Sequence, residues 1–163
     1  MRHLFRLIPT SLLLLFFFSC EIETCKENTP EISVENFEIE GDSGIATLYF
    51  KDCDGDIGLK PNESGGSQNY NLYFEFEEYK NGVYDTIGPL PLPYYYRVPF
   101  VNNGASSPLK EGEFLITLYP YYIAGYSDTF RYRVQFFDRA GNASNFAYTE
   151  TLIAPQTESD TLP

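Results

Sequence analysis

Apolar and polar residues alternate along most of the chain after residue 32. Apolar side chains recur at every second position in four stretches, within residues 46–50, 72–76, 114–118 and 130–136. Alternation with period two, rich in aromatic and β-branched residues, is typical of antiparallel strands with one buried face. The same region shows no sustained helical period. The pattern therefore predicts an all-β fold.

Eight strands are expected on this basis. They lie near residues 33–39, 44–51, 70–78, 83–87, 94–100, 113–119, 128–137 and 146–153. Lys80-Asn81-Gly82 predicts a hairpin turn, because Asn and Gly tolerate positive φ. Seven or eight short strands indicate an immunoglobulin-like antiparallel β-sandwich over residues 33–154, and a closed barrel is the alternative.

The first twenty residues follow a different pattern. Two arginines precede an apolar run over residues 12–18, which is shorter than the ~20 residues that span a bilayer. A serine then precedes Cys20. This is the layout of a bacterial lipoprotein signal peptide over residues 1–19, with cleavage before Cys20 and acyl chains on that cysteine. An ordinary secretory signal or an uncleaved anchor is the alternative.

Two further segments are polar and carry no strand pattern. Residues 20–32 predict a tether between the lipidated cysteine and the sandwich. Eleven extended residues reach at most ~40 Å, so the domain is expected close to its membrane. Residues 155–163 predict a loose tail.

Charge and histidine content restrict the function. Without residues 1–19 the remaining 144 residues carry nine Lys and Arg against 23 Asp and Glu, a formal net charge of −14. Such a surface repels nucleic acid, which we exclude as a partner. The only histidine, His3, lies in the signal, which argues against Ser-His-Asp catalysis and histidine-bound zinc. We therefore expect no enzyme, with a hydrolase based on a carboxylate pair as the alternative.

The sharpest motif is an acidic loop after the second expected strand. Asp52, Asp54 and Asp56 alternate with small residues, and carboxylates so spaced can surround Ca²⁺, which takes about 6–8 oxygen ligands. Glu63 stands where an EF-hand places its bidentate acid, but Ile57 occupies the EF-hand glycine position and no helix is expected on either side. We expect a calcium site of another geometry, or a tight turn whose Asp side chains bond to their own backbone.

A second polar motif covers residues 138–144, in the expected loop between strands F and G. Its Asp, Gly and Asn residues are turn formers in the first place. In an immunoglobulin-like sandwich, however, the B–C and F–G loops cluster at one end. Asp138 or Asn142 would then complete the ligand shell begun by the three aspartates.

Cysteines and tyrosines supply the remaining candidates. If Cys20 carries lipid, Cys25 and Cys53 are left as an even pair, which forms a disulfide in an oxidising compartment or stays as two free thiols. Clustered tyrosines can stack on a sugar ring or a peptide, or else fill half-buried strand positions. The tyrosines in question are Tyr94, Tyr95, Tyr96, Tyr121 and Tyr122.

Three stretches of sequence resemble a group of small Bacteroidota lipoproteins with an immunoglobulin-like or fibronectin-like sandwich. They read FKDCDGDIGL, YYYRVPF and DTFRYRVQFFDRAGNASN. The relaxed signal, with Phe17 and Phe18 before Ser19, is similar to theirs as well. The resemblance implies a lipid-anchored domain of the cell envelope, at the outer membrane, and supplies no catalytic residues. Cys53 departs from the Pro or Gly expected there, which favours its pairing with Cys25.

These observations predict a noncatalytic binding or accessory module that is held in the bacterial cell envelope by its lipid. Its expected partners are the membrane, through the anchor, and an envelope protein or a glycan. A calcium-stabilised adhesion or glycan-binding surface domain is the alternative, and a small carboxylate-dependent hydrolase is the third reading.

Overall fold

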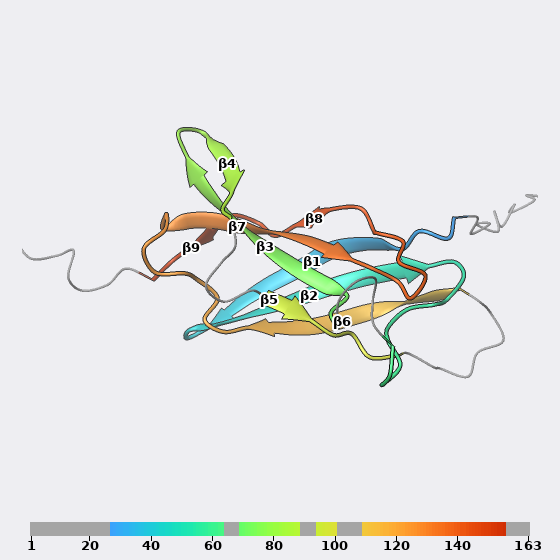
Figure 1. Ribbon diagram of the computed structural model, residues 1–163. Helices are drawn as coiled ribbons and strands as arrows, with labels where there is room; N and C mark the ends of the chain where they lie inside the picture. Colours follow the sequence, from blue (N-terminus) through green and yellow to red (C-terminus); the bar gives the residue numbers. More distant parts are fainter. Residues whose placement is uncertain (1–26, 64–68, 89–93, 101–108, 156–163) are drawn as a thin grey trace, which may run out of the picture.

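Two antiparallel β-sheets pack face to face in the computed structural model of the chain (Figure 1). The structure describes residues 27–63, 69–88, 94–100 and 109–155. The predicted signal peptide, Cys20, Cys25, most of the tether and nearly all of the tail lie outside these residues. Among the described residues, no helix has the length and apolar character to cross a bilayer.

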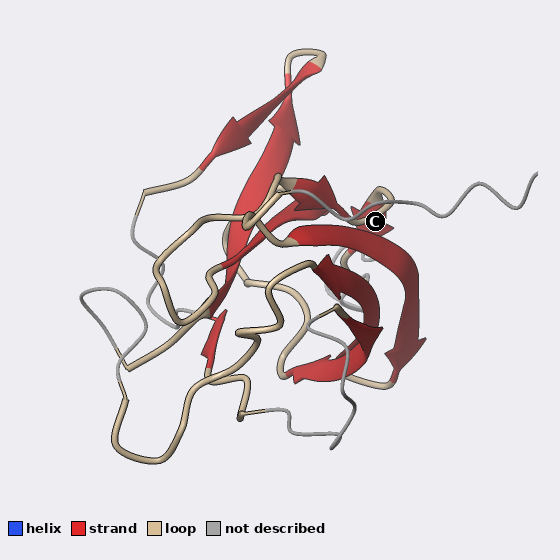
Figure 2. Ribbon diagram, turned by 90° about the vertical axis from the view of Figure 1, so that its right-hand side faces the viewer, coloured by secondary structure: helices blue, strands red, loops and turns tan. Residues whose placement is uncertain are grey.

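The described residues form nine strands, of which β2, β3, β6 and β7 carry the predicted alternation. They are β1 (Glu31–Glu40), β2 (Ser43–Asp52), β3 (Leu72–Lys80), β4 (Val83–Thr86), β5 (Tyr94–Tyr96), β6 (Lys110–Leu118), β7 (Thr129–Phe136), β8 (Ala147–Tyr148) and β9 (Leu152–Ile153). One sheet has the order β1-β2-β6. The other has the order β4-β3-β7-β8, with β5 paired to β3 and β9 paired to β7. The predicted all-β fold of antiparallel sheets, consistent with a β-sandwich, is thus confirmed, and loops join the strand ends (Figure 2).

The core lies between the two sheets and is largely aromatic. Alternate residues of β2 and β7 are buried along the whole length of both strands. Phe74 and Phe76 of β3 pack edge-on against Tyr132 of β7, with ring centroids 5.9 and 5.8 Å away. The Tyr132 hydroxyl donates a hydrogen bond of 3.0 Å to the carbonyl of Tyr121. The ring thereby contributes apolar area while its one polar atom is satisfied.

Two predicted strands differ from those observed. The strand expected over residues 94–100 ends at Tyr96, because Val98 then donates its N–H to the side chain of Asn71 rather than to a neighbouring strand. The strand expected over residues 146–153 is divided into β8 and β9. There the Thr149 hydroxyl accepts the N–H of Tyr132 at 3.0 Å and replaces a ladder hydrogen bond.

The connection from β2 to β3 is held against residues 98–100. Leu59 donates its N–H to the carbonyl of Val98, and Phe100 donates its N–H to the carbonyl of Leu59, both at 3.0 Å. Gly58 makes this approach feasible, because a Cβ there would collide with the carbonyl group of Pro99. Its φ of 75° is also one that L-residues avoid. The acidic loop therefore has a fixed downstream anchor.

Gly58→Ala is expected to destabilise the fold by about 3 kcal/mol, from backbone strain together with the collision. Gly82→Ala is the matched control, since Gly82 has a φ of 85° but open space around it. The control should cost only about 1 kcal/mol, from strain alone. Urea denaturation of the two variants measures both values, and equal losses would contradict the packing account of Gly58.

Candidate metal centre

In each sheet, one strand carries a row of inward-facing residues that leads to an aspartate. The two aspartates lie at the same end of the sandwich. On β2 the row of buried residues ends at Asp52, directly after Phe50 in the period of two. On β7 the row runs through Phe136 to Asp138. Both aspartates are fully buried, with 0% of their surface exposed. The alternation that buries the apolar side chains of these strands therefore buries two carboxylates as well.

Asp54 and Asp56 bring two further carboxylates to this place. One carboxylate oxygen from each of Asp52, Asp54 and Asp56 lies within 4.8 Å of the other two. The loop containing Asp138 joins them through backbone contacts, because Arg139 and Ala140 donate their N–H groups to the carbonyl and the carboxylate of Asp56, at 3.2 and 2.9 Å. We call these four residues, Asp52, Asp54, Asp56 and Asp138, the aspartate cluster.

Asp52 is the unusual member of the cluster. Neither of its carboxylate oxygens has a hydrogen-bond partner among the described residues, although both are buried. One buried oxygen of Asp56 is also unpaired. A buried polar group without a partner costs about 1–3 kcal/mol, and a charged one costs more. Among the described residues, no donor reaches the two oxygens of Asp52.

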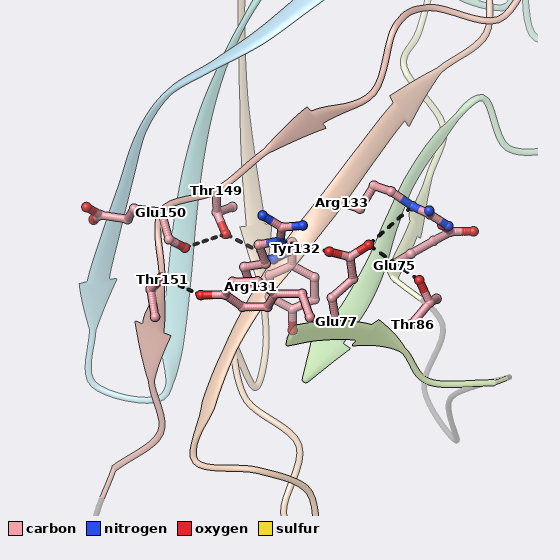
Figure 3. A network of polar contacts seen from close by, with 10 residues as sticks. Glu75, Glu77, Thr86, Arg131, Tyr132, Arg133, Thr149, Glu150 and Thr151 are labelled. Atoms are coloured by element: carbon pink, nitrogen blue, oxygen red, sulfur yellow. Dashed lines mark hydrogen bonds and ion pairs between the residues drawn. The ribbon is translucent and has the colours of Figure 1, made fainter. Parts of the chain in front are cut away.

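A second buried acid shows how this chain satisfies a carboxylate elsewhere. Glu77, on β3, is 5% exposed and receives the Nε of Arg131 at 2.7 Å. Arg133 and Thr86 lie at 3.7 and 3.4 Å from its other oxygen (Figure 3). Each oxygen of Glu77 thus has a donor nearby, whereas neither oxygen of Asp52 has one among the described residues.

The cluster favours protonation when no cation is present. Burial first, and then the charges of Asp54, Asp56 and Asp138, together raise the pKa of Asp52 to about 7. Burial and the charges of Asp138 and Asp54 also raise the pKa of Asp56, against the smaller effects of the Ala140 N–H and Arg139. Carboxylates that resist joint ionisation at this separation are ones that a bound cation would stabilise.

The loops around the cluster are fastened together by Arg139. Its guanidinium donates to the carbonyls of Ile57 and Gly58, both at 3.4 Å, and lies 4.9 Å from the centre of the Phe100 ring. Gly55 and Gly58, with φ of 72° and 75°, allow the chain to turn between these contacts. The cation of Arg139 is thus engaged by backbone oxygens of the loop.

Two other predicted ligands are placed differently. Asn142 supports Asp138, because its N–H and its side-chain amide donate to the two carboxylate oxygens at 2.8 and 2.7 Å. Glu63 points to Lys60 instead, whose N–H it accepts at 2.9 Å, and it lies 3.9 Å from Arg139. Glu63 is therefore outside the cluster, and its EF-hand-like spacing has no counterpart in the fold.

Cys53 lies between two members of the cluster and is disulfide-bonded. The chain contains two other cysteines, Cys20 and Cys25, and both lie outside the described residues. The Cys25–Cys53 pairing therefore stays a prediction, as does lipidation of Cys20.

The tyrosines predicted as a stacking surface are mostly structural. Tyr94 and Tyr121 are 6% and 3% exposed and belong to the core, where their hydroxyls donate to the carbonyls of Pro120 and Ile153. Tyr96 and Tyr122 are partly buried against the same core. Tyr95 alone of the five presents an exposed ring, at 38%. Tyr94 of β5 faces the interior of the sandwich, and Tyr121, in the connection between β6 and β7, packs into the same core.

Burial of Asp52 and Asp138 is the feature that the motif analysis missed. The sequence pattern does indicate this burial, because each aspartate continues an apolar row with period two, after Phe50 and after Phe136. A row that continues past a strand end places its next side chain on the same face. The next position of each row, two residues after Phe50 and after Phe136, is therefore expected to face inward as well.

Comparisons with protein-family models, with curated proteins and with solved structures found no match to this chain. The chemistry of the aspartate cluster accordingly rests on its own geometry.

We expect the metal-free protein to lose stability as the pH rises. The folded-state pKa of Asp52, about 7, lies above its ordinary value of 3.8. Its stabilising contribution is therefore complete below about pH 4 and is lost as the pH rises through 7. Urea denaturation in the presence of a chelator, at about pH 5 and about pH 8, measures the difference.

Asp52→Asn should reduce this difference, because an amide does not titrate. Asp85→Asn, at an exposed position on β4, is the control and should keep the wild-type pH dependence. Wild-type and Asp52→Asn proteins with the same pH dependence would contradict the placement of Asp52.

Proposed function

We propose that this chain is a lipid-anchored, noncatalytic binding module of the bacterial cell envelope whose β-sandwich is completed by a calcium ion at the aspartate cluster. The observation that carries the calcium site is the Asp52 carboxylate, which is fully buried beside two other carboxylates and has no hydrogen-bond partner in the described part of the chain. The anchor is supported by the signal pattern that ends at Cys20.

Calcium fits the donor set better than other common cations. The oxygens lie within 4.8 Å of one another, which one ion with ligands at about 2.4 Å on opposite sides can bridge. Mg²⁺ requires ligands at about 2.1 Å in a stricter octahedral geometry. Zn²⁺ prefers nitrogen and sulfur ligands, and Cys53 is already disulfide-bonded.

The burial of the cluster supports a structural rather than a catalytic ion. Asp52 and Asp138 have no exposed surface, whereas Asp54 is exposed and Asp56 is half-buried. An ion would thus enter from the Asp54 side and lie with buried oxygens behind it. The ion would then link the loops of the two sheets. The module would thereby present a rigid surface to a partner.

Calcium should raise the melting temperature of the chain from residue 21 onward by several degrees relative to chelator. A ligand that binds only the folded state adds about 2.7 kcal/mol at a hundredfold excess over Kd. Magnesium at the same concentration should have a smaller effect. Differential scanning calorimetry with calcium, magnesium or chelator measures the shift.

Asp54→Asn should lower the calcium affinity at least about tenfold, since it removes a charged ligand while leaving the buried residues in place. Asp85→Asn is again the control and should keep the wild-type affinity. Isothermal titration with calcium alone gives both values. A melting temperature that calcium leaves unchanged, with no heat of binding, would overturn the proposed site.

A further inference from the structure

The N-terminal segment enters the sandwich beside the aspartate cluster. The side-chain amide of Asn142 donates to the carboxylate of Asp138 at 2.7 Å and to the carbonyl of Asn28 at 3.0 Å. One side chain therefore contacts both a member of the cluster and the segment that precedes β1. Pro30, two residues further along, is buried. The segment is thus packed onto the domain at this point.

A second side chain of the same loop holds the next residues. The Asn145 side chain accepts the N–H of Ile32 at 2.9 Å and donates to the carbonyl of Ile32 at 2.8 Å. This pair of hydrogen bonds is the one that a neighbouring strand would make. The loop from residue 138 to residue 146 therefore binds the N-terminal segment through two asparagines, one of which also supports Asp138.

We propose that calcium binding at the aspartate cluster locks residues 27–32 onto the sandwich, so that the ion controls how the domain is held on its membrane tether. The proposal rests on the calcium site proposed above. Without the ion, the acidic side chains of the cluster repel one another across the two loops, which opposes the hydrogen bonds from Arg139 and Ala140 to Asp56. With the ion, the charge of Asp56 is matched and these hydrogen bonds keep the Asp138 loop in place. Asn142 then holds Asn28 on the same loop.

Hydrogen exchange of the full chain, purified in mild detergent, tests the coupling at single amides. The Ala140 N–H donates to the Asp56 carboxylate and reports on the cluster itself. The Ile32 N–H donates to Asn145 and reports on the N-terminal segment. Calcium alone is the added probe. We expect it to slow exchange at both amides, by about tenfold at Ile32, as is typical of coupled sites.

Asn142→Ala removes the link to Asn28 together with the support of Asp138. The calcium affinity of the variant is therefore measured first by titration, and exchange is read at a concentration that saturates it. At saturating calcium this variant should still show slowed exchange at Ala140, while exchange at Ile32 returns to the rate without calcium. Asn36→Ala is the matched control, because Asn36 lies on β1 and its amide donates only to the exposed Glu38. The control should keep the calcium effect at both amides.

The outcomes distinguish the two proposals. Slowed exchange at Ala140 with no change at Ile32 in the wild-type protein would overturn the locking of the N-terminal segment and leave the calcium site standing. A calcium effect at Ile32 that survives in Asn142→Ala would overturn the route through Asn142. Unchanged exchange at both amides, together with no heat of calcium binding, would overturn the calcium site and the lock together.

Discussion

An ionised carboxylate placed inside a protein must be matched by a positive charge or by donors, because its lost hydration costs several kcal/mol. Asp52 imposes this requirement on one end of the sandwich. It has no exposed surface and no hydrogen-bond partner among the residues that the structure describes, and the charges that raise its pKa are also negative. Glu77 meets the same requirement with Arg131 and Arg133. At Asp52 a bound cation or a proton would supply the match.

The contacts around Asp52 hold the neighbouring loops close to its carboxylate. The connection after β2 is anchored at Gly58 and Leu59 against residues 98–100, so Asp54 and Asp56 cannot move far from Asp52. The Asp138 loop is held to them by Ala140 and carries the side chains that bind the N-terminal segment. A change at the buried carboxylates therefore reaches both loops and the entry point of the chain.

Much of the fold could be predicted from the sequence, because apolar residues at every second position lie on the buried face of a strand. The rows on β2, β3, β6 and β7 identified the core-facing residues. The division between β8 and β9 could not be predicted, since it depends on the Thr149 hydroxyl meeting the N–H of a distant strand. The candidate ligands were found by residue type, but Glu63 was selected by analogy of spacing alone, and its true partner, Lys60, lies only three residues away.

The most direct test of the account is a crystal structure of the protein grown with calcium, with Mn²⁺ soaked in its place to give an anomalous signal. The account predicts one peak among the carboxylate oxygens of Asp52, Asp54 and Asp56, with ligand distances of about 2.2–2.6 Å. A structure without a peak, in which Asp52 is protonated and donates a hydrogen bond to Asp54 at high calcium concentration, would contradict it.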